Sequence, residues 1–295
     1  MSRSASAGVE VFADLRADVG EAPHWDERSK TLLFVDLTGG VVFRYDQSGA
    51  ELTSFPVGQE VGAVIPRCGG GLVLAVRDGI AVVTENGEGF ELTAPVERDT
   101  PGNRMNDAKC DQAGRLFAGT MSYDLAPHAG ALYRVGPDWS VEQVVPGVTQ
   151  SNGIAWSPGG SLMYFIDSAT HGVDVFDYDI DAGSAGHRKR LVTIERAHGI
   201  PDGMTADSQG NVWVACFGGG AVRCFSPAGV LLEEVFLPVS QVTSCAFGGP
   251  ELADLYVTSA AYRLSADQLK RQPHAGATFV CRPGAVGLPA TSFAG

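Results

Sequence analysis

This chain contains a repeated sequence pattern, and a polar side chain recurs at the first position of most repeats. This equivalent position is called the register position. The pattern is a polar residue, a small or turn-forming residue, an apolar run, a turn rich in Gly, Asp and Ser, and a second apolar run. By subtraction, the register positions lie 40, 45, 46, 50 and 42 residues apart. Five of the six are polar, and the set is Glu21, Val61, Asn106, Asn152, Asp202 and Ser244. Hard divalent cations prefer carboxylate and amide oxygens, so these side chains would form a metal site if they converged.

Repeats of this length, made only of short strands, indicate a β-propeller. We therefore expect an all-β fold, a six-bladed β-propeller with four-stranded antiparallel blades around a central channel. The repeats follow one another without a linker, which predicts a single domain over residues 1–295. Equivalent positions of the blades ring one axis in a propeller. The polar residues that open the inner strands should therefore meet at one mouth of the channel.

The fourth repeat shows the expected strands most clearly. Its apolar and alternating segments predict strands over 153–156, 162–166, 173–178 and 190–194. The sixth repeat lacks a clear outer strand, and we expect residues 9–12 to fill that place. Such a closure would remove an exposed sheet edge. Helical periodicity is expected only over 266–271.

The charge and composition exclude several function classes. The formal net charge of −13 argues against nucleic acid, whose phosphates need a basic surface, and gives no support for binding to an anionic membrane. No run of about 18 apolar residues is long enough to span a bilayer, and the first 20 residues lack the apolar core of a secretory signal. The six cysteines are widely spaced without a C-x-x-C pair, which favours buried, reduced thiols and a cytoplasmic location. A Cys216–Cys224 disulfide across a hairpin is the alternative.

Three register residues are the strongest ligand candidates: Glu21, Asn152 and Asp202. Two carboxylates and an amide suit one divalent ion, with water completing its shell. No histidine joins the set, which weakens the case for a dedicated zinc site without excluding zinc. The alternative is that each residue caps backbone N–H groups at a strand entry.

A second group of residues is expected to bind substrate beside the ion. Arg104 precedes Asn106 by two positions and so lies on the same side of an extended segment. Its fork of donors suits the paired oxygens of a polyhydroxylated or anionic molecule. The alternative is that Arg104 pairs with Asp107 or another local acid and only neutralises charge. Asp124 follows the second strand of the same repeat and is expected to reach the same mouth.

Four segments together resemble the SMP-30/gluconolactonase/regucalcin family, and the likeness covers essentially the whole chain. They read GEAPHWD, NRMNDAKCDQAGRLFAGTM, SNGIAWSPGGSLMYFIDS and IPDGMTADSQGNVWVA. The resemblance implies a six-bladed propeller with a divalent metal at the channel mouth, and hydrolysis of sugar lactones to aldonic acids. It assigns metal binding to Glu21, Asn152 and Asp202, and substrate binding to Arg104, Asn106 and Asp124. Regucalcin itself has Glu where this chain has Asp124.

The expected reaction is attack of water on the carbonyl of a lactone such as gluconolactone. Asp202 is expected to serve as ligand and as base, the alternative being that the cation acidifies the water and Asp202 orients it. Phosphotriester hydrolysis and a non-catalytic calcium- or ligand-binding propeller are the competing functions. Oxygen ligands do not rank Ca²⁺, Mg²⁺, Mn²⁺ and Zn²⁺. The sequence also leaves the sugar and the oligomeric state open.

Overall fold

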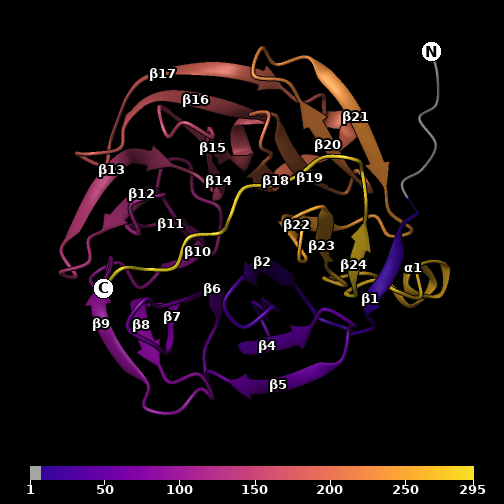
Figure 1. The fold of residues 1–295 in the computed structure, drawn as a ribbon, viewed down its shortest axis with the longest axis horizontal. Coiled ribbons are helices and arrows are strands. Elements are labelled where there is room, and N and C mark those ends of the chain that lie inside the picture. The colour runs from indigo at the N-terminus through magenta and orange to yellow at the C-terminus, as the bar shows by residue number, and fades with distance from the viewer. Residues whose placement is uncertain (1–7) are drawn as a thin grey trace.

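Six four-stranded antiparallel sheets form a ring in the computed structural model, which describes residues 8–295 (Figure 1). The first sheet contains β2 (Gly20–Asp26), β3 (Thr31–Asp36), β4 (Val41–Asp46) and β5 (Glu51–Pro56). The second contains β6 (Val61–Pro66), β7 (Leu72–Val76), β8 (Gly79–Val83) and β9 (Glu91–Pro95). The third contains β10 (Asn103–Cys110), β11 (Leu116–Ser122), β12 (Gly130–Val135) and β13 (Val141–Val148).

The remaining sheets continue the ring. The fourth contains β14 (Ser151–Trp156), β15 (Leu162–Asp167), β16 (Gly172–Asp179) and β17 (Ser184–Thr193). The fifth contains β18 (Ile200–Ala206), β19 (Val212–Phe217), β20 (Ala221–Phe225) and β21 (Leu231–Phe236). The sixth contains β22 (Val242–Gly248), β23 (Asp254–Ser259), β24 (Thr278–Cys281) and β1 (Glu10–Ala13). The structure confirms the expected six-bladed β-propeller.

The start of the chain closes the ring, as the sequence predicts. β1 pairs antiparallel with β24, with Glu10 opposite Val280 and Val11 opposite Phe279. The outer edge of the last sheet is therefore covered by a strand from the other end of the chain. The only α-helix among the described residues is α1 (Ala266–Arg271), at the expected place. Ser265 and Gln268 form a capping box at its start.

Burial falls from the inner to the outer strand of each blade. Inner strands such as β6 and β14 are buried along their whole length, because neighbouring blades cover both of their faces. The outer strand β17 is mostly exposed and polar, and it begins at Ser184 rather than at the predicted residue 190. The prediction missed this first half because an exposed edge strand lacks the apolar residues that mark a strand in sequence.

The cysteines are free thiols in the described chain, and five of the six are buried. Cys68 is exposed, contrary to the expectation that the thiols are buried. Cys216 pairs with Ala221, and Cys224 pairs with Trp213, so the two sulfurs do not face each other across the hairpin. In residues 8–295 no helix is long and apolar enough to cross a bilayer.

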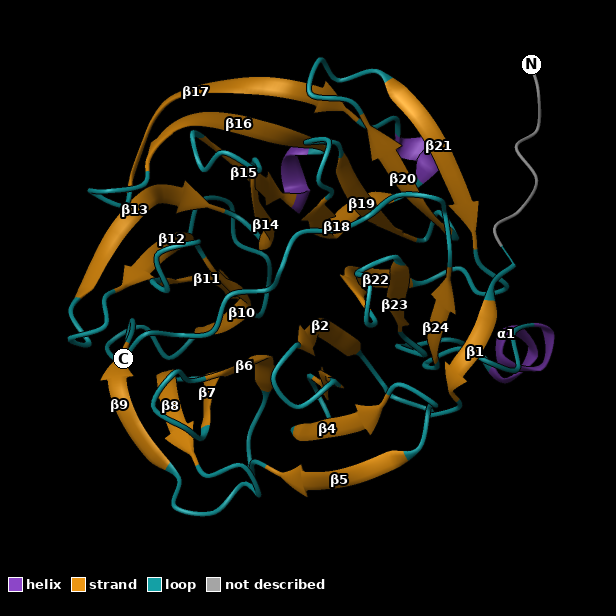
Figure 2. Ribbon diagram, in the orientation of Figure 1, coloured by secondary structure: helices purple, strands orange, loops and turns teal. Residues whose placement is uncertain are grey.

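The C-terminal segment runs across one face of the ring, over the central channel (Figure 2). It is anchored near its end by Phe293, which is fully buried and packs against Trp139. The backbone N–H of Phe293 donates to Pro66 O, and the carbonyl of Phe293 accepts from Cys68 N. Residues of this segment lie next to the ends of the inner strands, for example Gly287 beside Asp207. The starts of the inner strands therefore lie toward the opposite face.

Candidate functional site

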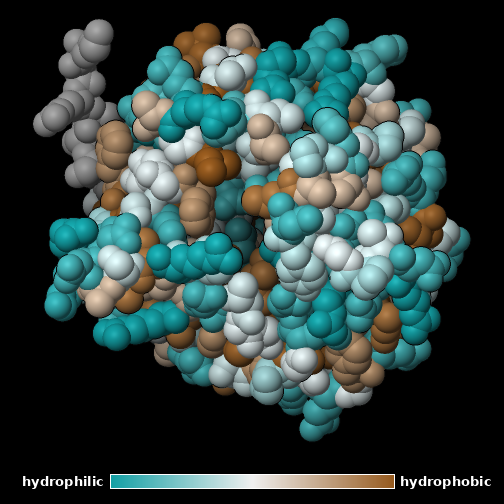
Figure 3. Space-filling model, turned by 180° about the vertical axis from the view of Figure 1, so that it is seen from behind, coloured by the Kyte–Doolittle hydropathy of each residue, from teal (hydrophilic) through white to brown (hydrophobic). Residues whose placement is uncertain are grey.

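The register residues lie near the starts of inner strands that pack side by side around the channel. β10 contacts β6 and β14, and β18 contacts β14 and β22. The face away from the C-terminal segment is hollowed near its centre (Figure 3). Hydrophilic residues lie inside this hollow, and some of the residues at its rim are hydrophobic. The convergence that the repeat pattern predicts therefore occurs at one end of the channel.

Each inner strand has an irregularity in its ladder at this level. In β10, pairing with β11 is interrupted between Met105 and Ala108, which leaves Asn106 and Asp107 outside the regular register. Similar interruptions lie at or next to the register residues of the other inner strands, which are Glu21, Val61, Asn152, Asp202 and Ser244. Bulges of this kind release side chains from the pleat and re-aim them. They explain how residues from different blades can turn toward one axis.

Small residues let neighbouring blades approach closely here. A Cβ atom on Gly62 would lie 1.8 Å from the carbonyl oxygen of Asn106. The equivalent atom on Gly153 would lie 2.7 Å from Asp202 O, and on Gly203 it would lie 2.1 Å from the Ser244 hydroxyl. The chain of one blade therefore passes very close to that of the next at these three glycines. Adjacent register positions are thus held close together across these three blade boundaries.

A chain of hydrogen bonds links three blades at this level. The Arg104 guanidinium donates through Nη1 to Asn106 Oδ1 at 2.7 Å. Asn106 Nδ2 donates to Asn152 Oδ1 at 2.8 Å, and Asn152 Nδ2 donates to Ser168 Oγ at 2.8 Å. Ser168 then donates to Pro201 O at 2.6 Å, next to Asp202. The network fixes the Asn152 amide, whose oxygen keeps a second lone pair.

Three carboxylates lie buried in the same region. Glu21, Asp107 and Asp202 are each 6–7 % exposed. Burial, followed by the charge of Asp107, raises the pKa of Glu21 from 4.5 to about 8. Burial, followed by the charges of Glu21 and Asp107, raises the pKa of Asp202 well above its ordinary value. The like charges are close enough to repel, so the cluster would be stabilised by a cation.

Two of these carboxylates accept few hydrogen bonds from the protein, so their oxygens are available to a divalent cation. Glu21 accepts from the N–H of Ala22 at 3.0 Å, and within residues 8–295 no hydrogen bond reaches the Asp202 carboxylate. The capping role considered for these residues is therefore seen only for Glu21, toward its own neighbour. Among residues 8–295, no three His, Cys, Asp or Glu side chains are arranged so that they alone could hold an ion. An ion here would depend on the Asn152 amide oxygen and on water.

Arg104 lies beside Asn106 and has no carboxylate partner among the described residues. It donates to Asn106 Oδ1 and to Met105 O, and no ion pair joins it to Asp107 in the described chain. Burial lowers the pKa of Arg104, while the negative charge of Glu60 opposes this effect. Nη1 makes both hydrogen bonds, so Nε and Nη2 still have donors for another molecule. The alternative of an Arg104–Asp107 pair is not observed.

Asp124 lies on an exposed loop and bonds within its own turn. Its carboxylate accepts from Ala126 N at 3.2 Å. The hydrogen bond with Ser122, followed by that from Ala126, lowers the pKa of Asp124. The loop follows β11, next to the segment that carries Arg104. The substrate contact expected for Asp124 stays a prediction.

Two residues that the sequence prediction did not single out lie beside Arg104. Tyr123 OH donates to Glu60 Oε2 at 2.7 Å, which joins the second and third blades. Both residues act electrostatically on Arg104. With Asn103 and Arg98 they line a polar recess of about 430 Å³. The available signal was the position of Glu60, one residue before the apolar register position.

Comparisons with known proteins place this geometry among related propellers. The family described as "SMP-30/Gluconolactonase/LRE-like region" matches residues 19–261. Regucalcin of Danio rerio is 42% identical over 294 residues, which cover 98% of this chain and 99% of that protein. Regucalcin of Homo sapiens is 38% identical over 297 residues, with the same coverage of both.

Two solved structures have the same fold over nearly their whole length. A luciferin-regenerating enzyme superposes with a TM-score of 0.91 at 36% identity, covering 97% of this chain and 99% of that one. A structure from Agrobacterium tumefaciens described as a calcium-binding protein, regucalcin, superposes with a TM-score of 0.93 at 27% identity. That match covers 98% of this chain and 97% of the other.

Proposed function

The chain belongs to the SMP-30/gluconolactonase/LRE-like family, and on that premise we propose that it hydrolyses a sugar lactone with the help of one divalent metal ion. The observation that carries the proposal is the set of oxygen donors at one end of the channel. Glu21, Asn152 and Asp202 come from three blades, and two of them are buried carboxylates that repel each other. Arg104 provides free donors beside them.

The family description supports this class of chemistry. The matching family includes gluconolactonase in its name. One structural relative is described as calcium-binding, which supports a cation at this site and also supports the second candidate, a calcium-binding propeller without catalysis. The free donors of Arg104 favour the enzyme, because a purely structural ion needs no adjoining group that binds polar molecules.

Arg104 and Asn106 would have different tasks in this reaction. Both Nδ2 hydrogens of Asn106 are used, on Ser151 O and on Asn152 Oδ1, each at 2.8 Å. Asn106 therefore orients Asn152 and offers substrate only the remaining lone pair of its own oxygen. Arg104 has unused donors on Nε and Nη2, which suit the hydroxyl and carbonyl oxygens of an aldonolactone. We assign recognition mainly to Arg104, with Asp124 as a further contact on the rim.

Asp202 would receive the proton of the attacking water. The water oxygen forms a bond to the lactone carbonyl carbon, the ring C–O bond breaks, and the proton passes from Asp202 to the departing oxygen. A bound divalent cation would supply positive charge that polarises the carbonyl and keeps the carboxylates ionised. Burial and the neighbouring carboxylates raise the pKa of Asp202, whereas a cation lowers it. The buried surroundings of Asp202 thus oppose the effect that a cation would have on its basicity.

A cytoplasmic location is part of the proposal. Thiols stay reduced in the cytoplasm, and all six cysteines are free in this structure. The proposed partner is the lactone alone, without nucleic acid or membrane.

The experiment is a pH-stat assay of gluconolactone hydrolysis, before and after treatment with a chelator. We expect activity that the chelator removes and that Ca²⁺, Zn²⁺, Mn²⁺ or Mg²⁺ restores, and the extent of recovery would rank the four metals. A phosphotriester assayed in parallel tests the competing hydrolase activity. Metal binding without turnover of any lactone would support the non-catalytic candidate instead.

A matched pair of variants locates the reaction. Asp202→Asn should remove turnover because the amide cannot accept the proton. Asp181→Asn is the control, since Asp181 lies on an exposed turn between β16 and β17. Retained activity and normal metal content in the Asp202 variant would remove Asp202 from the mechanism.

A further inference from the structure

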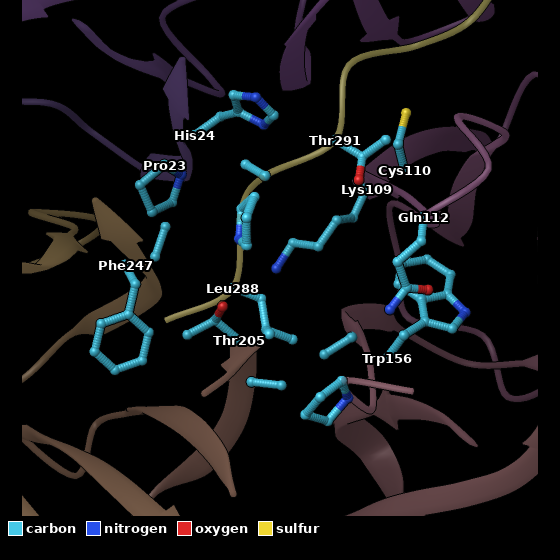
Figure 4. Close-up of a pocket in the computed structure, with 16 residues that line it drawn as sticks. Pro23, His24, Lys109, Cys110, Gln112, Trp156, Thr205, Phe247, Leu288 and Thr291 are labelled. Carbon is cyan, nitrogen blue, oxygen red and sulfur yellow. The ribbon is translucent and has the colours of Figure 1, made fainter. Parts of the chain in front are cut away.

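A second cavity lies at the other end of the channel, where the inner strands end and the C-terminal segment crosses. Its volume is about 270 Å³, several times the roughly 30 Å³ share of one water molecule. Trp156, Phe247 and Leu288 are among the apolar residues of its wall (Figure 4). None of the proposed metal ligands lines it.

The Lys109 ammonium group projects into this cavity (Figure 4). Its Nζ donates to Met204 O at 2.6 Å. No second hydrogen bond and no ion pair within 4 Å is found for it in residues 8–295, although the charge of Asp107 acts on it. An ammonium group has three donors, so two of them lack a protein acceptor.

His24 faces the same cavity from the first blade. It is only 8 % exposed, and no protein atom in the described chain hydrogen-bonds its ring. Burial lowers the pKa of His24 to about 4, and the charge of Lys109 acts in the same direction. The ring is therefore neutral at pH 7 and has one N–H donor. Two side chains from different blades thus line one cavity and have donors without a protein acceptor in the described chain.

The C-terminal segment forms one wall of the cavity. Its backbone is hydrogen-bonded at its two ends, and Leu288 between them packs against the core of the fourth and fifth blades. Gly287 N donates to Leu252 O on one side, and Phe293 N donates to Pro66 O on the other. Between these anchors, residues 288–291 line the cavity, and no backbone hydrogen bond joins them to the rest of the described chain. A displacement of this short stretch would open the cavity without breaking a strand.

We propose that this cavity binds a small carboxylate with an apolar body. The carboxylate oxygens would accept from Lys109 and His24, and the apolar body would pack against Trp156, Phe247 and Leu288. A carboxylate has only acceptors, about four lone-pair positions, which matches a site that has unpaired donors. An apolar wall with a few convergent polar groups is typical of small-molecule sites.

The probe for this proposal is benzoate, with benzyl alcohol as its uncharged counterpart, measured by isothermal titration calorimetry on the full chain. We expect saturable binding of benzoate to the natural chain. The affinity of Lys109→Met for benzoate, and that of the natural chain for benzyl alcohol, should each be lower by about tenfold or more, because a charge-assisted hydrogen bond is lost. Lys189→Met is the matched control, since Lys189 is exposed on β17. Benzoate binding that is absent in the natural chain, or equal in the Lys109 variant, would overturn the proposal.

Two further measurements keep the test decisive. Leu288→Trp fills the cavity while Lys109 is unchanged, and it should abolish benzoate binding even if the Lys109 variant does not fold. Unchanged benzoate binding by a folded Leu288 variant would contradict the proposed location. The titration is repeated on metal-loaded and chelated protein, and equal affinities are expected. Loss of binding on chelation would place benzoate at the other mouth of the channel and refute the proposal.

Discussion

Replacing Gly62 by alanine should damage the candidate site without touching any proposed ligand. The new Cβ would lie 1.8 Å from Asn106 O, whereas an ordinary carbon–oxygen contact is about 3.3 Å. The two backbones must therefore separate by about 1.5 Å. The contact is with backbone on a neighbouring blade, so a change of side-chain rotamer cannot relieve it.

The size of the effect follows from this displacement. Overpacking of a close contact costs about 1–3 kcal/mol, and each kcal/mol lowers the melting temperature of a chain this large by roughly 2–4 °C. The Asn106–Asn152 hydrogen bond of 2.8 Å would not survive a shift of that size. A misplacement of about 1 Å can reduce catalysis about 100-fold. We expect a similar loss of lactonase activity.

The assay compares thermal unfolding and kcat/KM of Gly62→Ala with those of Gly69→Ala. A Cβ on Gly69 would meet nothing within 4 Å, so this control should melt within a degree or two of the natural chain. Equal melting temperatures and equal activities for both variants would refute the argument that close blade contact positions the site. A loss of stability alone would separate the packing argument from the proposed function.

Three other predictions test separate parts of the account. Phe293→Ala should destabilise the chain by about 3–5 kcal/mol, because this fully buried ring anchors the C-terminal segment; urea unfolding measures it, and an unchanged midpoint would contradict the anchoring role. Glu60→Gln and Tyr123→Phe should each raise KM for a lactone more than they lower kcat, and an unchanged KM in both would remove the pair from substrate recognition. Binding of a cation at pH 7 should release about one proton or more, because the pKa of Glu21 is about 8 in the metal-free chain. Calorimetry in buffers of different ionisation enthalpy measures this release, and finding no release would contradict the prediction. For the same reason the metal-free chain should lose stability as pH rises from 4.5 to about 8, because only the folded state keeps the Glu21 proton in that window.

Much of the architecture could be predicted because repeated strands leave a periodic signal. The register residues marked the inner strands, and the missing outer strand of the last repeat correctly indicated closure by the start of the chain. The polar half of β17 was missed, since an exposed edge strand has no apolar alternation. The C-terminal segment was also missed, because Phe293 is one apolar residue in an irregular stretch.

The sequence pattern indicated which side chains meet at the candidate site, but it did not indicate the hydrogen bonds between them. Matched register was enough to bring Glu21, Asn152 and Asp202 to one end of the channel. The bulges that release the register side chains depend on pairing between strands, which a single sequence does not show. The link from Tyr123 to Glu60 joins residues 63 positions apart and has no sequence motif. Side-chain hydrogen bonds between blades therefore require the structure.

The central claim is that Glu21, Asn152 and Asp202 hold one divalent cation together. Anomalous diffraction from a crystal of this protein grown with Mn²⁺ tests it most directly. We predict one strong peak at the mouth away from the C-terminal segment, bounded by oxygens of all three side chains. A manganese peak elsewhere, with these three side chains directed apart, would contradict the account.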